Sequence, residues 1–343
     1  MTKVTKFGGI LDGYKRKVGS TDCSDRNKDY ICFLQEPFRE VGRRSGVSER
    51  RGATPVSASD SQYSVTVLVM KRLLFVSLAL WGMFGLSQAH GQSHTLSFQP
   101  GEELTYTASY SAAVLTTDVA TVTFRTTTDQ VEGIPCYRIW ARGVTRPFYS
   151  VFFKMDDVYE TWLEQSSLRP LVATSDLKEG SYRYRSRMQF NWKSGLVYTY
   201  GKNLKRGYEK GRTMSVTGAD LDPVSHFFNL RCLGALSQMK SGQKGRLNLV
   251  MVDTIRTVEY KFLGREIIET PATGPVRCLK FTCQLAPDDA QSFQEGTDFF
   301  IWLSDDQNRI PVYLETPIRV GRVFATLTDW KNLAHPFSSR IRQ

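Results

Sequence analysis

Histidine is scarce in this chain, and the short motifs on which many enzymes depend are missing. Only four histidines occur in 343 residues, and two of them, His90 and His94, stand together well before the main body of the chain. The sequence contains no Gly-x-Ser-x-Gly nucleophile elbow, no Gly-x-x-x-x-Gly-Lys-Ser/Thr phosphate loop and no His-Glu-x-x-His zinc motif. These absences weigh against the corresponding classes of enzyme. We expect no catalytic residues, no metal and no cofactor.

The apolar run near residue 80 is too short to cross a bilayer. It covers residues 73–86, about 14 residues, whereas a membrane-spanning helix needs roughly 20. The basic pair Lys71 and Arg72 precedes it, and the small residues of Ser87-Gln88-Ala89 follow it. This order predicts a signal peptide over residues 70–91, cleaved after Ala89 or, as the alternative, after Gly91, and therefore a periplasmic or secreted protein without a transmembrane span.

The first 69 residues show no sustained period of apolar positions. Arginine pairs and clustered Ser, Asp and Gly dominate them, and such a segment buries too little apolar surface to offset its ordering entropy. We expect residues 1–69 to be disordered and absent from the mature protein, with Met70 as the true start. A cytosolic regulatory tail starting at Met1 is the alternative.

Removing these segments lowers the net charge. The whole chain carries 45 basic and 34 acidic residues, of which 14 basic and 8 acidic residues lie before residue 90. The remaining body therefore has 31 basic and 26 acidic residues. The excess of basic residues is concentrated in residues 178–212.

The body contains four cysteines, Cys136, Cys232, Cys278 and Cys283. A disulfide between Cys136 and Cys232 stays open as a possibility. Cys278 and Cys283 would point to opposite faces of one expected strand, so a disulfide between them is not expected.

Arginine alternates with aromatic and apolar residues between Tyr182 and Trp192. In a strand, this pattern places Arg183, Arg185 and Arg187 on one face and the aromatic side chains on the other. The arginine face is a candidate anion-binding surface for a lipid head group or an envelope polysaccharide; nucleic acid is not expected as a partner. A solvated outer face that keeps the strand from pairing wrongly is the simpler explanation.

The same two-residue period runs through the body of the chain. Leu104, Tyr106 and Ala108 alternate with polar residues, and about a dozen such segments are separated by turn signals. The sequence predicts a single, mainly β domain over residues 92–335, in which a curved antiparallel sheet forms an open or flattened barrel. Residues 336–343 are expected to be a C-terminal tail.

One segment follows a helical period instead. Asp222 is a suitable N-cap and Pro223 a suitable first helical residue, which predicts one helix at about 223–240. Its residues Phe227 and Phe228 are expected to cover the sheet and are candidate ligand contacts. His226 is expected to be a core or helix-surface histidine without a catalytic role.

Two hairpins resemble each other. Each has a strand that ends in Trp-Leu, then a short turn and a second strand entered near a proline, at Trp162 and Pro170 and again at Trp302 and Pro311. Both tryptophans are candidate ligand contacts. The turn that contains Asp306 lacks the ligand spacing of a calcium loop, and its Asp and Asn residues suit a tight hairpin.

Taken together, these segments resemble a known family. The strand that begins Gly101-Glu102-Glu103, the capped helix that begins Asp222-Pro223 and the hairpin Trp302-Leu303-Ser304 are similar to the exported bacterial domain-of-unknown-function family numbered three-one-zero-eight. This resemblance implies an exported, mostly β protein of unassigned activity and supplies no catalytic residues. The two hairpins are also similar to those of lipoprotein carriers, whose curved open barrels hold acyl chains.

Three hypotheses on function follow. The first is a non-catalytic envelope protein that binds or carries an apolar or lipid-like ligand inside the curved sheet. The second is a structural or assembly factor that contacts an anionic partner through the arginine face. The third is a hydrolase of envelope polymers, which requires two carboxylates that face a common cleft; Asp156 and Asp157 point to opposite faces of a strand and do not fit.

Overall fold

The computed structural model describes residues 96–112, 115–285, 299–317 and 321–341. The expected extension 1–69, the signal peptide 70–91 and its cleavage site at Ala89 lie outside these residues. All described residues belong to one compact unit, Ser57–Gln343.

The described chain is mainly β, as the alternating sequence predicts. Fifteen strands form one sheet in which β1 and β15 lie side by side near the middle, and β8 and β9 form its two edges. The strands are β1 Glu103–Ala112, β2 Leu115–Val131, β3 Ile134–Thr145, β4 Asp156–Glu164, β5 Pro170–Glu179, β6 Tyr182–Asn191, β7 Leu196–Asn203, β8 Glu209–Ser215, β9 Asp220–Leu221, β10 Lys244–Val250, β11 Ile255–Thr270, β12 Gly274–Leu285, β13 Phe299–Ser304, β14 Pro311–Pro317 and β15 Arg322–Lys331. Neighbouring strands are antiparallel except for β9 and β10.

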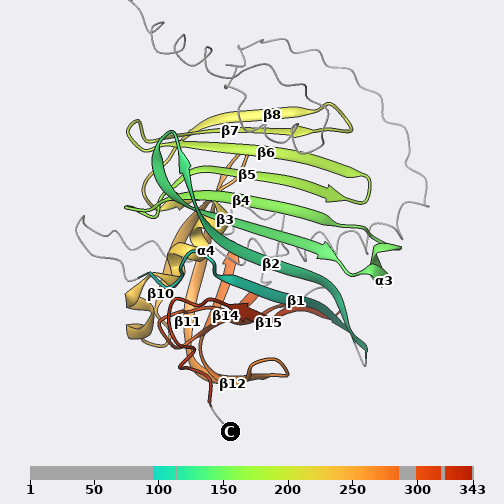
Figure 1. The fold of residues 1–343 in the computed structure, drawn as a ribbon, viewed down its shortest axis with the longest axis vertical. Coiled ribbons are helices and arrows are strands. Elements are labelled where there is room, and N and C mark those ends of the chain that lie inside the picture. The colour runs from blue at the N-terminus through green and yellow to red at the C-terminus, as the bar shows by residue number, and fades with distance from the viewer. Residues whose placement is uncertain (1–95, 113–114, 286–298, 318–320, 342–343) are drawn as a thin grey trace, which may run out of the picture. The chain divides into compact units, whose positions relative to one another are not determined.

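Figure 1 shows the two parts of this sheet. Strands β3–β8 are stacked across the view, and the strands labelled β10, β11, β12, β14 and β15 lie below and behind them. Among the described residues, the sheet is not closed by strand pairing, because β8 pairs only with β7 and β9 only with β10. The expectation of an open, curved antiparallel sheet is confirmed.

The inner face of the sheet carries the apolar residues of the alternating pattern. Leu104, Tyr106 and Ala108 of β1 are buried, and Val122 and Phe124 of β2 lie across from them on the same face. This periodicity of two determines which side chains enter the core. The core therefore continues across the sheet from β1 and β2 to β10–β15.

Helix α4, Pro223–Arg231, occupies the concave side of the sheet. It contacts both β4 and β10, which eight strands separate in the sheet order. At a spacing of about 4.8 Å per strand, these two would lie roughly 43 Å apart in a flat sheet. The sheet must therefore curl around α4.

The start of α4 follows the sequence, whereas its end comes earlier than expected. Asp222 accepts hydrogen bonds from the amides of Val224 and Ser225 at 3.1 and 3.2 Å, as an N-cap does. The helix stops at Arg231 because Leu233 is extended, and a separate 3₁₀ helix follows at Gly234–Gln238. Periodicity alone did not separate the two, because buried Leu236 continues the apolar pattern.

The two similar hairpins become β4–β5 and β13–β14. Both have a register shift directly after the tryptophan, so that Leu163 pairs with Pro170 and Leu303 with Pro311. Each proline thus begins its strand next to an irregularity, where the sheet needs no backbone N–H from that residue.

The four cysteines are free and buried at separate places. Cys136 lies on β3 and Cys232 caps the end of α4.

The expected C-terminal tail packs against the sheet: Ser339 Oγ donates to Asp306 at 2.7 Å, and Arg340 Nε donates to the Thr273 carbonyl at 2.8 Å.

Side chains bridge the open edges of the sheet. Thr199 of β7 donates to the carbonyl of Val252, and Lys210 of β8 forms an ion pair with Asp253. Both partners lie in the turn between β10 and β11, so β7 and β8 contact this turn through polar groups and through the small cluster around buried Val250.

Candidate functional site

A pocket of about 490 Å³ lies where three connecting segments meet at one end of the strands. The short helix α3, Pro147–Ser150, leads into the first segment. We call this pocket and its border the rim site. Its lining consists of residues 150–154, residues 179–182 of the β5–β6 turn, and Asn203, Lys205 and Arg206 of the β7–β8 turn.

Backbone hydrogen bonds hold these segments together. The Gly180 amide donates to the Lys154 carbonyl at 2.6 Å, and the Leu204 amide donates to the Arg183 carbonyl at 2.9 Å. Asn203 Oδ1 accepts from the amides of Lys205 and Arg206 at 3.1 and 2.9 Å. The positions of the turns are therefore fixed by the fold, and the long side chains beyond them remain exposed.

The outer border of the rim site is apolar. Phe148, Val151 and Phe152 are 71%, 82% and 72% exposed, and we call them the apolar tip. The rings of Phe148 and Phe152 lie 6.2 Å apart, and Leu204 and Tyr208 of the β7–β8 turn are also exposed. Single exposed apolar residues are common, but a group of them at one end of a sheet marks a surface suited to a partner or a membrane.

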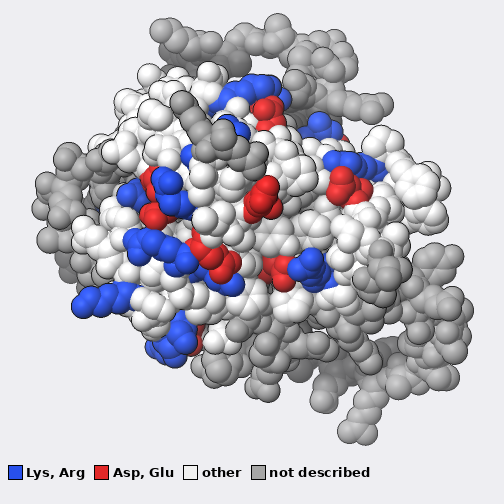
Figure 2. All heavy atoms as spheres, turned by 90° about the horizontal axis from the view of Figure 1, so that it is seen from below, with Lys and Arg blue, Asp and Glu red and all other residues white. Residues whose placement is uncertain are grey.

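Three exposed cations line the same pocket. Lys154, Lys205 and Arg206 form no ion pair with any described residue. On the face shown in Figure 2, by contrast, most basic and acidic side chains lie in neighbouring groups. The rim site thus combines apolar surface with uncompensated positive charge.

A buried carboxyl pair lies at the inner side of the pocket. Burial, and then the charge of neighbouring Glu179, raise the pKa of Asp157 to about 8, although Asp157 accepts a hydrogen bond from the Lys178 amide at 2.8 Å. The two carboxyl groups therefore share a proton at neutral pH. Glu179 lines the pocket, whereas Asp157 has no exposed surface, so the pair does not present the two accessible carboxylates that a glycosidase uses.

The three predicted anion-binding arginines have different surroundings. Alternation along β6 is as expected, because Tyr184, Met188 and Phe190 are buried and the arginines point to the other face. Arg183 Nη1 donates to the carbonyls of Gly180 and Tyr182 at the rim site.

The other two arginines lie further along β6. Arg185 forms an ion pair with Asp176 at 3.3 Å. The Nε of Arg187 is buried without a hydrogen-bond partner among the described residues, and burial lowers its pKa. The structure therefore brings only Arg183 next to the pocket, and the anion-binding role of all three stays a prediction.

The four predicted ligand contacts lie in two separate places. Phe227 and Phe228 are fully buried in the interior, where Phe228 meets Phe98 edge-on at 5.0 Å. Trp162 and Trp302 belong instead to small clusters outside the main core. Their role in ligand binding also stays a prediction.

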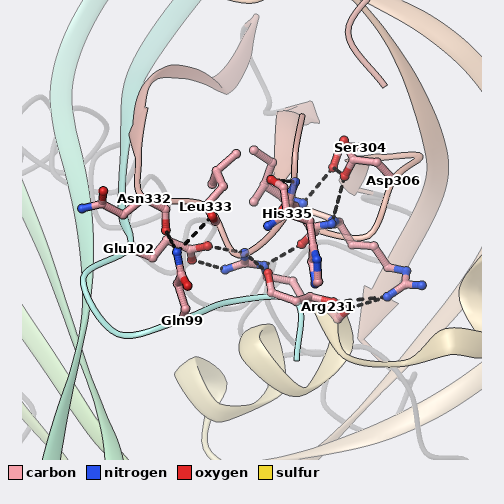
Figure 3. Close-up of polar contacts among 12 residues, drawn as sticks. Gln99, Glu102, Arg231, Ser304, Asp306, Asn332, Leu333 and His335 are labelled. Atoms are coloured by element: carbon pink, nitrogen blue, oxygen red, sulfur yellow. Dashed lines mark hydrogen bonds and ion pairs between the residues drawn. The ribbon is translucent and has the colours of Figure 1, made fainter. Parts of the chain in front are cut away.

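A buried polar cluster surrounds the end of α4 (Figure 3). The guanidinium of Arg231 donates to both carboxylate oxygens of Glu102 at 2.6 and 2.8 Å, and to the carbonyls of Ser97 and Asn308 at 2.7 and 3.0 Å. Since its donors are satisfied within the fold, this cluster joins α4 to the chain before β1 and to the β13–β14 turn. It is structural.

Two residues noted in the sequence also have structural roles. Asp306 Oδ1 accepts from the Ser304 hydroxyl and the Asn308 amide at 2.9 and 3.0 Å, which confirms the expectation of a hairpin turn. His226 Nε2 donates to the Asn248 carbonyl at 2.8 Å, and burial lowers its pKa to about 4, which fits a neutral core histidine. Among the described residues, no group of three or more His, Cys, Asp or Glu side chains could hold a metal ion.

Sequence reasoning missed the rim site. A usable signal was present: the run from Pro147 to Phe153 contains three phenylalanines between Arg146 and Lys154. A short apolar and aromatic segment between basic residues is typical of interfacial contacts. Its combination with the β7–β8 turn depends on the curvature of the sheet and cannot be read from the sequence.

The chain is similar to known proteins of unassigned function. No curated protein matches the chain. The crystal structure of a β-barrel-like protein of the domain of unknown function DUF1849 from Brucella abortus is similar at 11% identity and a TM-score of 0.46, with 68% of this chain and 98% of that chain covered. No helix among the described residues is both long and apolar enough to span a bilayer. The family model for the protein of unknown function DUF3108 matches residues 105–328, well over half of the sequence, and the chain therefore belongs to the DUF3108 family.

Proposed function

We propose that this protein is a non-catalytic, exported envelope protein that binds an anionic lipid surface through the rim site. The observation that carries this proposal is the position of three uncompensated cations, Lys154, Lys205 and Arg206, beside an exposed apolar tip. An interfacial lipid contact requires this pairing, because apolar side chains enter the boundary of the acyl region while cations remain at the head groups.

The expected energies are sufficient for membrane association. Burying one Phe or Val side chain contributes about 1.5–3 kcal/mol, and each Lys or Arg near an anionic surface contributes about 1 kcal/mol. Three residues of each kind exceed the binding strength of a single myristoyl chain, which gives only marginal attachment. The rigid backbone of the turns reduces the entropy lost on binding.

The interior of the sheet supports a lipid carrier less well. Phe227 and Phe228 of α4 are fully buried there, and the ring of Phe227 packs against that of Phe124 at 5.8 Å. An acyl chain inside the sheet would have to displace the helix and the buried Arg231 cluster. We therefore assign the lipid contact to the rim site.

The test is flotation of the purified protein with vesicles. We expect the protein to float with vesicles that contain phosphatidylglycerol and to float much less with pure phosphatidylcholine. Replacing the apolar tip, in the F148S/V151S/F152S variant, should abolish flotation. The matched control is Ile267→Ser, which removes another exposed apolar side chain, 58% exposed, from β11. A protein that never floats, or a tip variant that floats like the control, would contradict the proposal.

Export is tested separately. The signal peptide predicts that the protein isolated from its host starts near residue 90. N-terminal sequencing of that protein checks the cleavage site at Ala89. Retention of Met1 would contradict the export part of the proposal without affecting the vesicle experiment.

A further inference from the structure

We propose that the pocket of the rim site binds the phosphate of a lipid head group, so that the protein selects phospholipid over other anionic amphiphiles. This inference rests on the proposed function and names the ligand of the same site. The apolar tip supplies attachment to the membrane, whereas the pocket behind it supplies selectivity.

The size of the pocket fits this ligand. Its volume of about 490 Å³ lies within the range of small-molecule sites, roughly 300–1,000 Å³. It can hold a glycerol phosphate group, and it is too small for a folded partner. Phe152 and Phe153 line it on the side of the apolar tip, so a bound head group can continue into acyl chains at that border.

The charge of the lining fits a phosphate. Lys154, Lys205 and Arg206 line the pocket, and the guanidinium of Arg206 can donate two parallel hydrogen bonds to phosphate oxygens. The backbone amides of Lys205 and Arg206 both donate to Asn203 Oδ1, which fixes the backbone that carries these two cations.

The inner side of the pocket offsets only part of this charge. Asp157 and Glu179 share a proton, so that they carry one negative charge together instead of two. Tyr182 also lines the pocket, and burial followed by the charges of Glu179 and Asp157 raises the pKa of its hydroxyl, which stays protonated. A protonated hydroxyl is a hydrogen-bond donor, as phosphate oxygens require.

The experiment compares two kinds of vesicle at the same surface potential. One contains phosphatidylglycerol and the other contains oleate, adjusted to equal zeta potential. We expect tighter binding of the wild-type protein to phosphatidylglycerol, by about tenfold. The K154Q/K205Q/R206Q variant should bind phosphatidylglycerol about 100-fold more weakly, since each cation near an anionic surface contributes a factor of about five. It should also lose the preference.

The control variant is K193Q/K240Q/K244Q. It removes three exposed lysines from positions outside the pocket lining, and none of them forms an ion pair with a described residue. This variant should retain the preference for phosphatidylglycerol. If it loses the preference to the same extent, the effect is one of net charge and the pocket is not responsible.

Soluble competitors identify the source of the phosphate. We expect glycerophosphoglycerol to compete with phosphatidylglycerol vesicles for the protein. Competition by inorganic phosphate as well would show that the pocket also binds the free ion. Equal binding of the two vesicles, together with no competition by either probe, would overturn the inference. The two proposals can be separated. Loss of vesicle binding by the F148S/V151S/F152S variant, with retained glycerophosphoglycerol binding, supports both proposals. Vesicle binding by the wild-type protein without any preference for phosphatidylglycerol supports the proposed function alone.

Discussion

The two tryptophan hairpins, β4–β5 and β13–β14, make equivalent contacts through different residues. Trp162 donates its indole N–H to Asp129 of β2 at 2.8 Å, and Trp302 donates to Glu266 of β11. Arg138 lies over the ring of Trp162 at 5.4 Å and Lys280 over that of Trp302 at 4.8 Å. Each tryptophan is thus held between a carboxylate and a cation.

The strand register repeats as well. Arg138 pairs with Trp162, and Lys280 pairs with Trp302. The acidic partners also have equivalent positions, because Asp129 pairs with Cys136 and Glu266 pairs with Cys278. Strands β2–β5 and β11–β14 are therefore two versions of one arrangement. The resemblance of the two sequences reflects a repeated structural unit.

The two halves differ in how helix α4 is attached to them. The amide of Asn229 donates to the Leu168 carbonyl in the first turn at 2.8 Å, whereas the guanidinium of Arg231 donates to the Asn308 carbonyl in the second. The first attachment is neutral, and the second brings a buried ion pair with Glu102. Because the repeated parts serve the fold, the features that belong to one half, such as the rim site, are better guides to function.

The largest expected effect comes from breaking the charged attachment. Arg231→Met leaves Glu102 buried without its partner, and the free energy of unfolding should fall by about 3–5 kcal/mol. Urea denaturation of the purified protein measures this loss. The double variant Glu102→Met with Arg231→Met removes both charges and should recover part of it.

The neutral attachment provides the comparison. Asn229→Ala removes one amide that bonds the Leu168 carbonyl and the Ser225 carbonyl, and the expected loss is about 1–2 kcal/mol. If Arg231→Met is no more destabilising than Asn229→Ala, the buried ion pair is not the stronger of the two attachments.

The alternating pattern was sufficient to predict the sheet. Residues such as Leu104, Tyr106 and Phe124 alternate with polar neighbours, and the two-residue period of a strand translates directly into burial. Asp222 and Pro223 likewise located the start of α4, because capping depends on residues adjacent in the chain. These features are local, and a single sequence contains them.

The contacts that depend on curvature were not predictable. Arg231 and Glu102 are 129 residues apart, and nothing in their neighbours indicates that the sheet brings them together. The pairing of Asp157 with Glu179 was also missed, because it depends on the register between β4 and β5. Sequence reasoning treated Asp157 together with Asp156, which instead forms an ion pair with Arg142 at 2.6 Å.

The carboxyl pair, a feature of the first half, gives a prediction on pH. The pKa of Asp157 is raised from 3.8 to about 8 in the folded state, so the folded protein binds more protons than the unfolded chain between these values. The stability that this proton supplies is fully present below about pH 4 and is lost as the pH rises to about 8. Asp157→Asn removes the dependence and should be more stable than wild type at pH 9 by about 1–3 kcal/mol.

Urea denaturation of both proteins at pH 5 and pH 9 measures this difference. The control Asp156→Asn changes the half-buried neighbour, whose pKa is lowered by its hydrogen bond to Arg142, and should not gain stability at high pH. Parallel pH profiles for wild type and Asp157→Asn would show that the two carboxyl groups do not share a proton.

The smallest expected effect tests whether the two tryptophans are equivalent. Trp162→Phe and Trp302→Phe each remove one indole N–H and leave a partly solvated carboxylate, so each should lower the free energy of unfolding by about 1–2 kcal/mol. Trp140→Phe is the control, because Trp140 lies under Arg125 and its ring N–H bonds no described residue. Equal losses support two versions of one structural unit. A variant that keeps its stability but binds phosphatidylglycerol vesicles more weakly would instead give that tryptophan the ligand-binding role predicted from the sequence, and would separate the two halves by function.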